Sequence, residues 1–413
     1  MTATYTPQAR AAYHPSPEGL NAQQAYELIT AEASEYAQNT TLHEELGLGQ
    51  SSLTEGMVNG PHTWLYLDET DNQVQNFKLN GAGNAVDKVA GVLTPGSDLL
   101  VPSAGNWAQA VIHAAGFFGF NAVVYCPRDI TAPKEEAIHQ RAAEAGTTVK
   151  VMKNFNSVDS AISRATNDAA GRDDAELLHP FDNVYGVAGQ ALIGKRIVAG
   201  LVQRADQKLW HPYKDQVVIE VPQGGGSLLA ATAFEVEKAR LQGRFGSNVE
   251  VRAARPNQAA DIKKFDGLDV KRMGTLGRLA NNDQRFVRGT TTFSEADAGR
   301  ALGLIYQAIR KKVEPSGAAA TAAMLADAAN NKQPTTYVSV ISGANVSDER
   351  YAYFRDAPRR EQAALLRSGG PLGTSNERYT KQLMNKVNGW TYGEPRRTLH
   401  SASGPTWEDR DPS

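Results

Sequence analysis

Short apolar runs alternate with amphipathic stretches through the middle of the chain. Each run has the length of a buried strand, and each stretch repeats its apolar residues with the spacing of a helix. The predicted strands are residues 98–102, 122–126 and 147–152, and the predicted helices are residues 106–117, 133–145 and 158–169. The order strand, helix, strand, helix is typical of a parallel sheet with helices on its faces.

The same alternation returns in the second half, after a long helical stretch at residues 184–204. The predicted strands there are residues 216–221, 248–253 and 336–341, and the predicted helices are residues 228–241, 294–311 and 317–329. The first half adds a strand-like run at residues 64–67 and one helix near residues 22–36. After Ser347 the sequence becomes polar and rich in Arg, Gly, Pro and Ser, so we expect an irregular tail with one short helical segment near residues 359–366.

The composition is that of an ordinary globular protein of 413 residues, long enough for two or three domains. The formal net charge is -2 and no block of like charge stands out, which argues against a nucleic-acid partner. Cys126 is the single cysteine, so a disulfide within the chain is excluded, and its place in an apolar run predicts a core residue. The N-terminus lacks an apolar signal core, and polar residues and glycines interrupt the most apolar region, 108–126. We therefore expect a cytoplasmic protein without a membrane segment.

A run of three glycines follows the strand predicted at residues 216–221. Gly224-Gly225-Gly226-Ser227 stands between this strand and a helix, where glycines let the backbone approach an anion and the helix N-terminus offers free N–H groups. A dinucleotide fingerprint would need glycine in place of Leu229, and a P-loop would need Gly-Lys-Ser or Gly-Lys-Thr. The run therefore predicts a site for a mononucleotide or a phosphorylated cofactor, or else a tight turn.

Lys78 stands behind an aromatic residue, Phe77, in the stretch Gln75-Asn76-Phe77-Lys78-Leu79-Asn80-Gly81-Ala82. An amine in this setting is either a Schiff-base lysine or a surface lysine at a helix start. Most lysines are solvated, so the motif alone favours the surface interpretation. Three later stretches change the balance, because each can be interpreted as one part of a pocket for a phosphorylated aromatic aldehyde: residues 103–106, 224–227 and 342–345.

Two of these stretches, and a third with a glutamate, place polar groups at the ends of predicted strands or at helix starts. Ser103-Ala104-Gly105-Asn106 lets a bound carboxylate reach backbone N–H groups, or else Asn106 is simply an N-cap. Ser342-Gly343 follows the last predicted strand, so the Ser342 hydroxyl either bonds a ring nitrogen or belongs to a turn. Glu314, in Glu-Pro-Ser-Gly-Ala, is either a polar group near a cofactor ring or part of a helix cap.

Taken together, these stretches resemble the fold-type II pyridoxal-phosphate enzymes, and most of all the threonine dehydratases, with serine racemase close by. The family's lysine motif Ser-Phe-Lys-Leu-Arg-Gly-Ala is matched by residues 76–82, and its Ser-x-Gly-Asn-His loop by residues 103–107. The other matches are Pro180-Phe181-Asp182, Ala188-Gly189-Gln190, the glycine cup at 224–227, Glu-Pro-Ser-Gly-Ala at 314–318 and Ser-Gly-Ala-Asn at 342–345. The resemblance covers roughly residues 40–350, and an ordered set of motifs is more specific than any one of them.

The resemblance implies an α/β fold of two three-layer parallel-sheet domains, like that of the tryptophan synthase β subunit. The expected parts are an N-terminal arm (1–40), a large cofactor-binding domain (41–97 and 181–347), a small substrate-binding domain (98–180) and an irregular C-terminal tail (348–413). Family members are usually dimers or tetramers, so a homodimer or homotetramer is expected.

The resemblance also implies roles for single residues. Lys78 is expected to be catalytic and to hold pyridoxal 5'-phosphate as a Schiff base. The expected cofactor-binding residues are Phe77, Lys78, Asn106, Gly224, Gly225, Gly226, Ser227, Glu314 and Ser342. The expected substrate-binding residues are Ser103, Ala104, Gly105, Asn106 and Trp107.

Four positions depart from the family motifs, because Asn76, Asn80, Trp107 and Ser227 stand where the family has Ser, Arg, His and Gly. Backbone N–H groups survive all four changes, so we expect cofactor binding to survive. Asn76 and Trp107 leave room for a larger or more polar substrate side chain than that of threonine. Relatives of the serine-racemase kind take a divalent-cation ligand from a Glu-Pro that reads Arg255-Pro256 here, and arginine cannot ligate a cation, so no metal site is expected. We also expect no regulatory domain and no feedback control by isoleucine.

The function implied is removal of water and ammonia from a β-hydroxy amino acid such as threonine or serine, to give a 2-oxo acid. Lys78 would take the Cα proton, Ser342 would be the neutral partner of the ring nitrogen, and the cofactor phosphate would protonate the leaving hydroxyl. One alternative keeps the cofactor and is a racemase, or a β-replacement or β-elimination enzyme, acting on a larger or more polar amino acid. Another alternative is a nucleotide-binding or regulatory protein on the same scaffold, since a fold does not fix a function.

Overall fold

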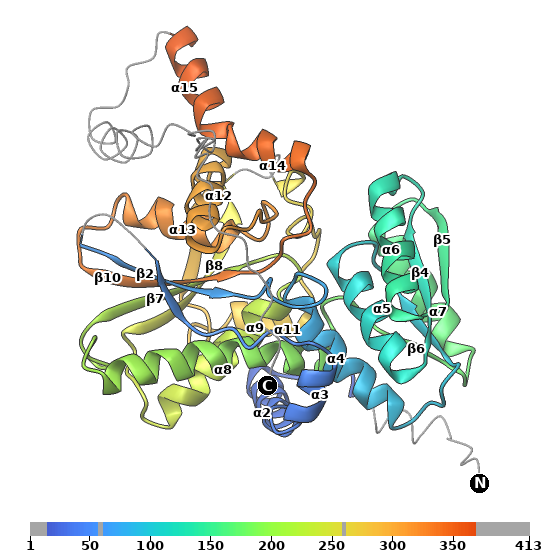
Figure 1. Ribbon diagram of the computed structural model, residues 1–413. Helices are drawn as coiled ribbons and strands as arrows, with labels where there is room; N and C mark the ends of the chain where they lie inside the picture. Colours follow the sequence, from blue (N-terminus) through green and yellow to red (C-terminus); the bar gives the residue numbers. More distant parts are fainter. Residues whose placement is uncertain (1–14, 57–60, 258–261, 369–413) are drawn as a thin grey trace, which may run out of the picture.

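The strands form two sheets in the computed structural model, which describes residues 15–56, 61–257 and 262–368 (Figure 1). The larger sheet contains β1 (Thr54–Gly56), β2 (Thr63–Asp68), β7 (Gln216–Pro222), β8 (Val249–Pro256), β9 (Gly289–Phe293) and β10 (Thr335–Ile341). The smaller sheet contains β3 (Asp98–Val101), β4 (Asn121–Pro127), β5 (Val149–Phe155) and β6 (Ala175–Leu177). Their orders are β1-β2-β10-β7-β8-β9 and β5-β4-β3-β6. All neighbours are parallel except the edge pair β1 and β2.

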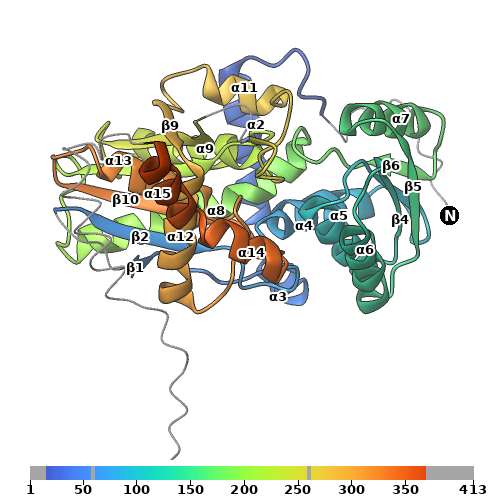
Figure 2. The same ribbon diagram turned by 90° about the horizontal axis from the view of Figure 1, so that it is seen from above.

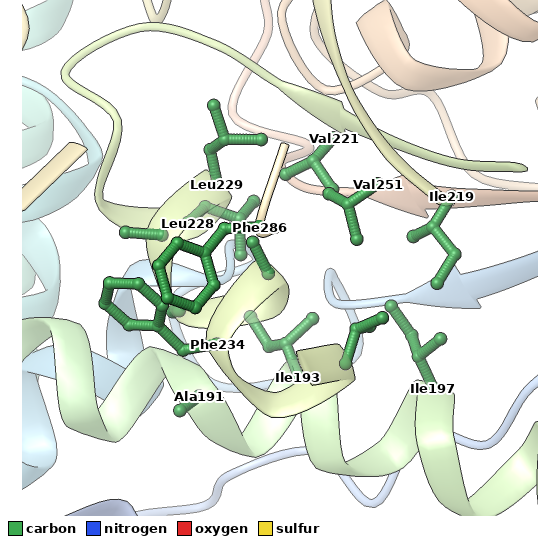
Figure 3. Packing of buried hydrophobic residues seen from close by; sticks show 14 of the residues in the cluster. Ala191, Ile193, Ile197, Ile219, Val221, Leu228, Leu229, Phe234, Val251 and Phe286 are labelled. Carbon is green, nitrogen blue, oxygen red and sulfur yellow. The ribbon is translucent and has the colours of Figure 1, made fainter. Parts of the chain in front are cut away.

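Helices cover both faces of the larger sheet, as a parallel sheet requires. On one face lie α2 (Ala22–Tyr36), α8 (Val184–Asp206), α9 (Ser227–Leu241) and α11 (Thr275–Asn281), and on the other lie α12 (Glu295–Ile309) and α13 (Ala319–Ala328) (Figure 1). The central strand β7 is therefore a nearly continuous apolar run that is buried on both sides. Figure 3 shows Ile193 and Ile197 of α8 facing Ile219 and neighbouring strand residues, while Phe234 of α9 lies beside Phe286.

The smaller sheet has its own two helical layers. On one face lie α5 (Asn106–Phe118) and α6 (Ala132–Ala145), and α7 (Val158–Ala170) covers the other. A further helix, α4 (Lys78–Ala90), packs against both α5 and α8 and so joins this layer to the larger sheet (Figure 1). The expected three-layer α/β fold is confirmed. The proposed domain boundaries, 98–180 for the small domain among them, stay a prediction.

The predicted strands and helices in the regular part of the chain are confirmed, with ends that differ by a few residues. The N-terminal segment expected to be a polar arm buries Ala25, Ile29 and Ala33 of α2 in the large core, against α8 and α9. A short helix, α3 (Thr40–Glu45), crosses the boundary drawn at residue 40.

The residues described after Ser347 are helical rather than irregular, so the expectation of an irregular tail is wrong for them, whereas the short helical segment expected near residues 359–366 is confirmed. Ser347 caps α14 (Asp348–Arg355) by accepting the backbone N–H of Arg350, and α15 (Ala357–Ser368) follows. Tyr351 and Phe354 bury the inner face of α14, so a helix with only two buried residues in eight is held by tertiary packing. The rest of the predicted tail, 369–413, lies outside the described residues. No helix among the described residues is long and apolar enough to cross a membrane.

Candidate active site

Lys78 is the first residue of α4, and its amine points into the protein. The Nζ atom donates hydrogen bonds to the carbonyl of Pro180, at 2.8 Å, and to the hydroxyl of Ser227, at 3.3 Å. The backbone of Lys78 is also held in place, because the Asn76 side chain accepts the backbone N–H of Lys78 at 3.0 Å. The helix that joins the two sheets thus presents its amine to the start of α9.

The surroundings of this amine are apolar. Nζ lies 4.9 Å from the ring centre of Phe77 and 5.6 Å from that of Trp107. Burial without a carboxylate partner disfavours the charged form and lowers the pKa of Lys78 to about 7. A large part of the lysine population is therefore neutral near physiological pH, which is the form that acts as a nucleophile or a base. The interpretation of Lys78 as a surface lysine is wrong.

The glycine run forms a close turn between β7 and α9. Gly226 has φ +89°, a left-handed conformation that favours glycine. A Cβ atom on Gly225 would lie 2.2 Å from the Phe181 ring, so a side chain has no room there. The backbone of the run therefore reaches the N-terminus of a 15-residue helix without side chains in the way, and Ser227 begins that helix. Such a turn is suited to an anion.

Asn106 is not the N-cap of α5, which corrects one interpretation of the sequence. Gly105 is the capping residue, and it makes no side-chain cap. The Asn106 side chain instead donates to Glu314 Oε1 at 2.9 Å and accepts from the Asn345 side chain at 2.8 Å. Ser103 accepts the N–H of Gly105 at 3.3 Å within the same turn.

Glu314 lies deep beside Asn106. Burial raises the pKa of its carboxyl group to about 7, against the hydrogen bond from Asn106, which lowers it. The backbone N–H of Glu314 donates to the Gly343 carbonyl at 3.1 Å, next to Ser342. Polar groups from α5 and from the end of β10 therefore meet at one carboxyl group.

Ser342 follows β10 and is held by its backbone. Its carbonyl accepts the N–H of Phe77 at 3.0 Å, and its N–H donates to the Gly317 carbonyl at 3.2 Å. The hydroxyl takes part in none of the hydrogen bonds among the described residues, although the residue is 4% exposed. It is therefore available to a ligand.

The expected site residues fall into two connected sets. Contacts around the amine join Lys78 to Phe77, Trp107 and Ser227. Ser342 is linked to this set through its carbonyl, which accepts the N–H of Phe77, and Asn106 joins Glu314 through its side chain. Trp107 is buried, and its indole N–H donates to the Leu178 carbonyl at 2.9 Å, which holds the ring as a wall. Ser103 and Ala104 share the turn of Asn106, and a Cβ atom on Gly105 would meet nothing within 4 Å, so this turn borders open space.

His179 is a neighbour of the amine that the motifs did not single out. Its Nδ1 atom accepts the backbone N–H of Asp182 at 2.9 Å, so the neutral ring carries its proton on Nε2. Burial, together with the nearby charge of Lys78, lowers the pKa of His179 to about 4. The residue precedes the matched stretch Pro180-Phe181-Asp182, and a lone histidine beside a motif gives no signal of its own.

A model of the pyridoxal-phosphate dependent enzyme family matches residues 55–343. The biosynthetic L-threonine dehydratase of Burkholderia multivorans is 31% identical over 303 residues, which cover 70% of this chain and 56% of that enzyme. The chain thus spans little more than half the length of this curated relative.

Two solved structures share the fold. The processed threonine deaminase isoform 2 of Solanum lycopersicum superposes with a TM-score of 0.60 at 20% identity, over 86% of this chain and 95% of that one. The serine racemase of Dictyostelium discoideum gives a TM-score of 0.59 at 23% identity, over 77% of this chain and 98% of that one. At these identities the likeness shows the fold alone.

Proposed function

The chain belongs to the pyridoxal-phosphate dependent enzyme family, and on that premise we propose that it is a lyase that removes water and ammonia from a β-hydroxy amino acid. The products are a 2-oxo acid and ammonia. The similarity to a threonine dehydratase supports a substrate of the threonine or serine kind.

The residues present fit pyridoxal 5'-phosphate. The glycine run offers a cradle for a phosphate that no Cβ atom obstructs from within the run, and it ends one hydrogen bond from the Lys78 amine. That amine is partly neutral near pH 7, as bonding to an aldehyde requires. The unengaged Ser342 hydroxyl is a neutral partner for a ring nitrogen. The proposed holders are Phe77, Lys78, Asn106, Gly224, Gly225, Gly226, Ser227, Glu314 and Ser342.

The chain's own residues then have separate tasks. Bound pyridoxal phosphate supplies an electron sink for the charge left on Cα. The neutral Lys78 amine takes the Cα proton, and the rings of Phe77 and Trp107 keep water from it. The turn Ser103-Ala104-Gly105-Asn106-Trp107, which borders open space, receives the substrate carboxylate on its backbone N–H groups.

The observation that carries the proposal is the buried setting of Lys78, without a carboxylate partner, beside the start of α9. Replacement of Lys78 by Ala should abolish the visible band of the bound cofactor and the formation of oxo acid from L-threonine and L-serine. Replacement of the exposed Lys214 by Ala is the control and should change neither. An active Lys78→Ala variant would refute the proposal.

The product assay also separates the alternative chemistries. Oxo acid and ammonia support the lyase. Formation of a D-amino acid, or of a substituted alanine when an external nucleophile is added, would instead assign racemisation or β-replacement to the same site. Because the fixed Trp107 ring borders the site, a wider panel of amino acids should be assayed as substrates.

We further propose a cytoplasmic homodimer or homotetramer whose only substrate partner is a small amino acid. The family resemblance supports this assembly, and the balanced charge of the chain supports the absence of a nucleic-acid partner. Light scattering of the purified protein measures the mass directly, and a monomer would contradict the assembly.

A further inference from the structure

Residues 262–274, which we name the strap, pass over the candidate site. The N–H of Gly267 donates to the Ser316 hydroxyl at 3.0 Å, two residues from Glu314. The N–H of Gly274 donates to the Gly225 carbonyl at 3.0 Å. A Cβ atom placed on Gly267 would lie 4.0 Å from Glu314 Oε1. The strap therefore touches both the glycine run and the turn that carries Glu314.

Two buried side chains of the strap anchor it in the core of the larger sheet. Phe265 is fully buried, with ring centres 5.4 Å from Phe293 and 5.1 Å from Phe354. Leu268 is buried in the same core. Asp266 lies between these two anchors and is exposed, so its carboxylate faces away from the core.

Ion pairs tie the strap to two helices around the smaller sheet and to α14, which packs on the larger sheet. Asp266 bonds Lys134 of α6 at 2.9 Å, and its other oxygen bonds Arg350 of α14 at 2.9 Å. Lys271 of the strap lies 3.7 Å from Asp159 of α7. In Figure 2, α14 lies on the side of the larger sheet that faces α6. A movement of the smaller sheet with its helices would therefore pull on the strap.

The same charges act on the buried carboxyl group of Glu314. The pKa of Glu314 is raised by burial and by Asp266 and is lowered by Asn106, Arg350 and Lys134. These groups come from the strap, α5, α14 and α6, which are the elements that face this carboxyl group. The strap thus combines a mechanical contact and an electrostatic one.

We propose that Asp266 is a positioning residue, which uses its ion pairs with Lys134 and Arg350 to hold the strap, and with it Glu314, in place for the amino acid substrate. The kinetic part of this inference rests on the proposed function, whereas the link between Lys134 and the strap does not. Asp266 therefore couples the position of the smaller sheet to that of the site.

Replacement of Lys134 by Gln tests the link, with replacement of Lys153 by Gln as the matched control. The two lysine side chains are 44% and 45% exposed, but Lys153 of β5 pairs with Glu135 of α6, so this pair stays within the smaller sheet and its helices. In the holoenzyme we expect Lys134→Gln to raise KM for the amino acid about two- to fivefold, the range for an exposed ion pair, with kcat little changed. The control should keep the wild-type KM.

The pH profile separates positioning from a merely structural role. The midpoint near pH 7 that belongs to the Glu314 carboxyl group should move to higher pH in Lys134→Gln, because this variant loses a cation near Glu314. It should move to lower pH in Asp266→Asn, which loses an anion there. Unmoved profiles in both variants would overturn the inference, even if KM changed.

Amide hydrogen exchange gives a readout that needs no turnover. Lys134→Gln should speed exchange in residues 262–274, whereas Lys153→Gln should leave those amides protected as in the wild type. Equal protection in both variants would overturn the link. If the wild-type chain failed to form an oxo acid, the proposed function would fall, and the exchange measurement would still decide the role of Lys134.

Discussion

Burial alone lowers the pKa of the Lys78 amine from 10.5 to about 7. The neutral amine therefore accumulates above pH 7 in the folded chain, about three units below the usual range. We expect the cofactor-free protein to take up pyridoxal phosphate at a rate that rises with pH through a midpoint near 7. Stopped-flow absorbance measures this rate, and a midpoint near 10 would mean that the amine is solvated.

Glu220 provides a second prediction at the residue scale, and it concerns stability. This carboxyl group on β7 is fully buried and accepts one hydrogen bond from the Thr291 hydroxyl at 2.7 Å, while its Oε2 atom has no partner among the described residues. Burial raises its pKa to about 8, so the folded state keeps a proton that the unfolded state releases near pH 4.5.

The free energy of unfolding should therefore fall as the pH rises from about 4.5 to about 8 and level off above 8, with a slope of at most about 1.4 kcal/mol per pH unit from this group. Glu220→Gln should remove this part of the slope, and the exposed Glu45→Gln should retain it. Urea unfolding at several pH values across this range measures how the free energy of unfolding depends on pH. Identical slopes for the wild type and Glu220→Gln would contradict the prediction.

Some residues of the candidate site could be predicted from the sequence, and others could not. The motifs shared with the family pointed to Lys78, Ser227 and Ser342, and the structure places Lys78 beside Ser227 and Ser342 beside Phe77. The partners of Asn106 were not accessible, because Glu314 and Asn345 lie more than 200 positions away in the chain. His179 was missed for the same reason, since only the fold shows that it lies near Lys78.

Among the elements, the turn from β7 into α9 has the strongest steric requirement. Gly225→Ala would place a Cβ atom 2.2 Å from the Phe181 ring, so one of the two must move. We expect a loss of stability of about 1–3 kcal/mol and a weaker hold on the cofactor. Gly303→Ala in α12 is the matched control, because its Cβ would meet nothing within 4 Å and alanine favours a helix by up to about 1 kcal/mol. Thermal unfolding and cofactor titration of both variants test this, and equal behaviour would contradict it.

Strands and helices could be predicted from the sequence where their apolar residues recur with a regular period. They could not be predicted where contacts with the rest of the fold stabilise them. The strand at 216–221 and the helix at 228–241 were found because both are almost fully buried. The edge strand β9 was missed, since three of its five residues are exposed. The helix α14 was missed because its polar sequence hides the two aromatic residues that hold it.

At the scale of the whole molecule, α4 is the element on which both sheets depend, and a buried polar network fixes its first turn. Glu69 is 3% exposed and accepts from Arg196 of α8 at 2.9 Å and from the Asn80 side chain at 2.9 Å. Arg196 also donates to Asn80 Oδ1 at 3.2 Å. Asn80 stands where the resembling family has arginine, so in this chain α8 supplies the guanidinium group beside α4.

Removal of this guanidinium group should therefore affect stability and the site together. Arg196→Gln leaves the Glu69 carboxylate buried without a cation, which costs about 3–5 kcal/mol when a buried pair is broken. It also frees the start of α4, so Lys78 should hold the cofactor less tightly. Arg204→Gln removes the other ion-paired arginine of α8, whose partner Glu55 is 57% exposed, and should change stability by about 0.5 kcal/mol or less. If Arg196→Gln unfolded at the same urea concentration as Arg204→Gln, Glu69 would not depend on Arg196, and the joint between the two sheets would have to rest on the apolar contacts of α4 alone.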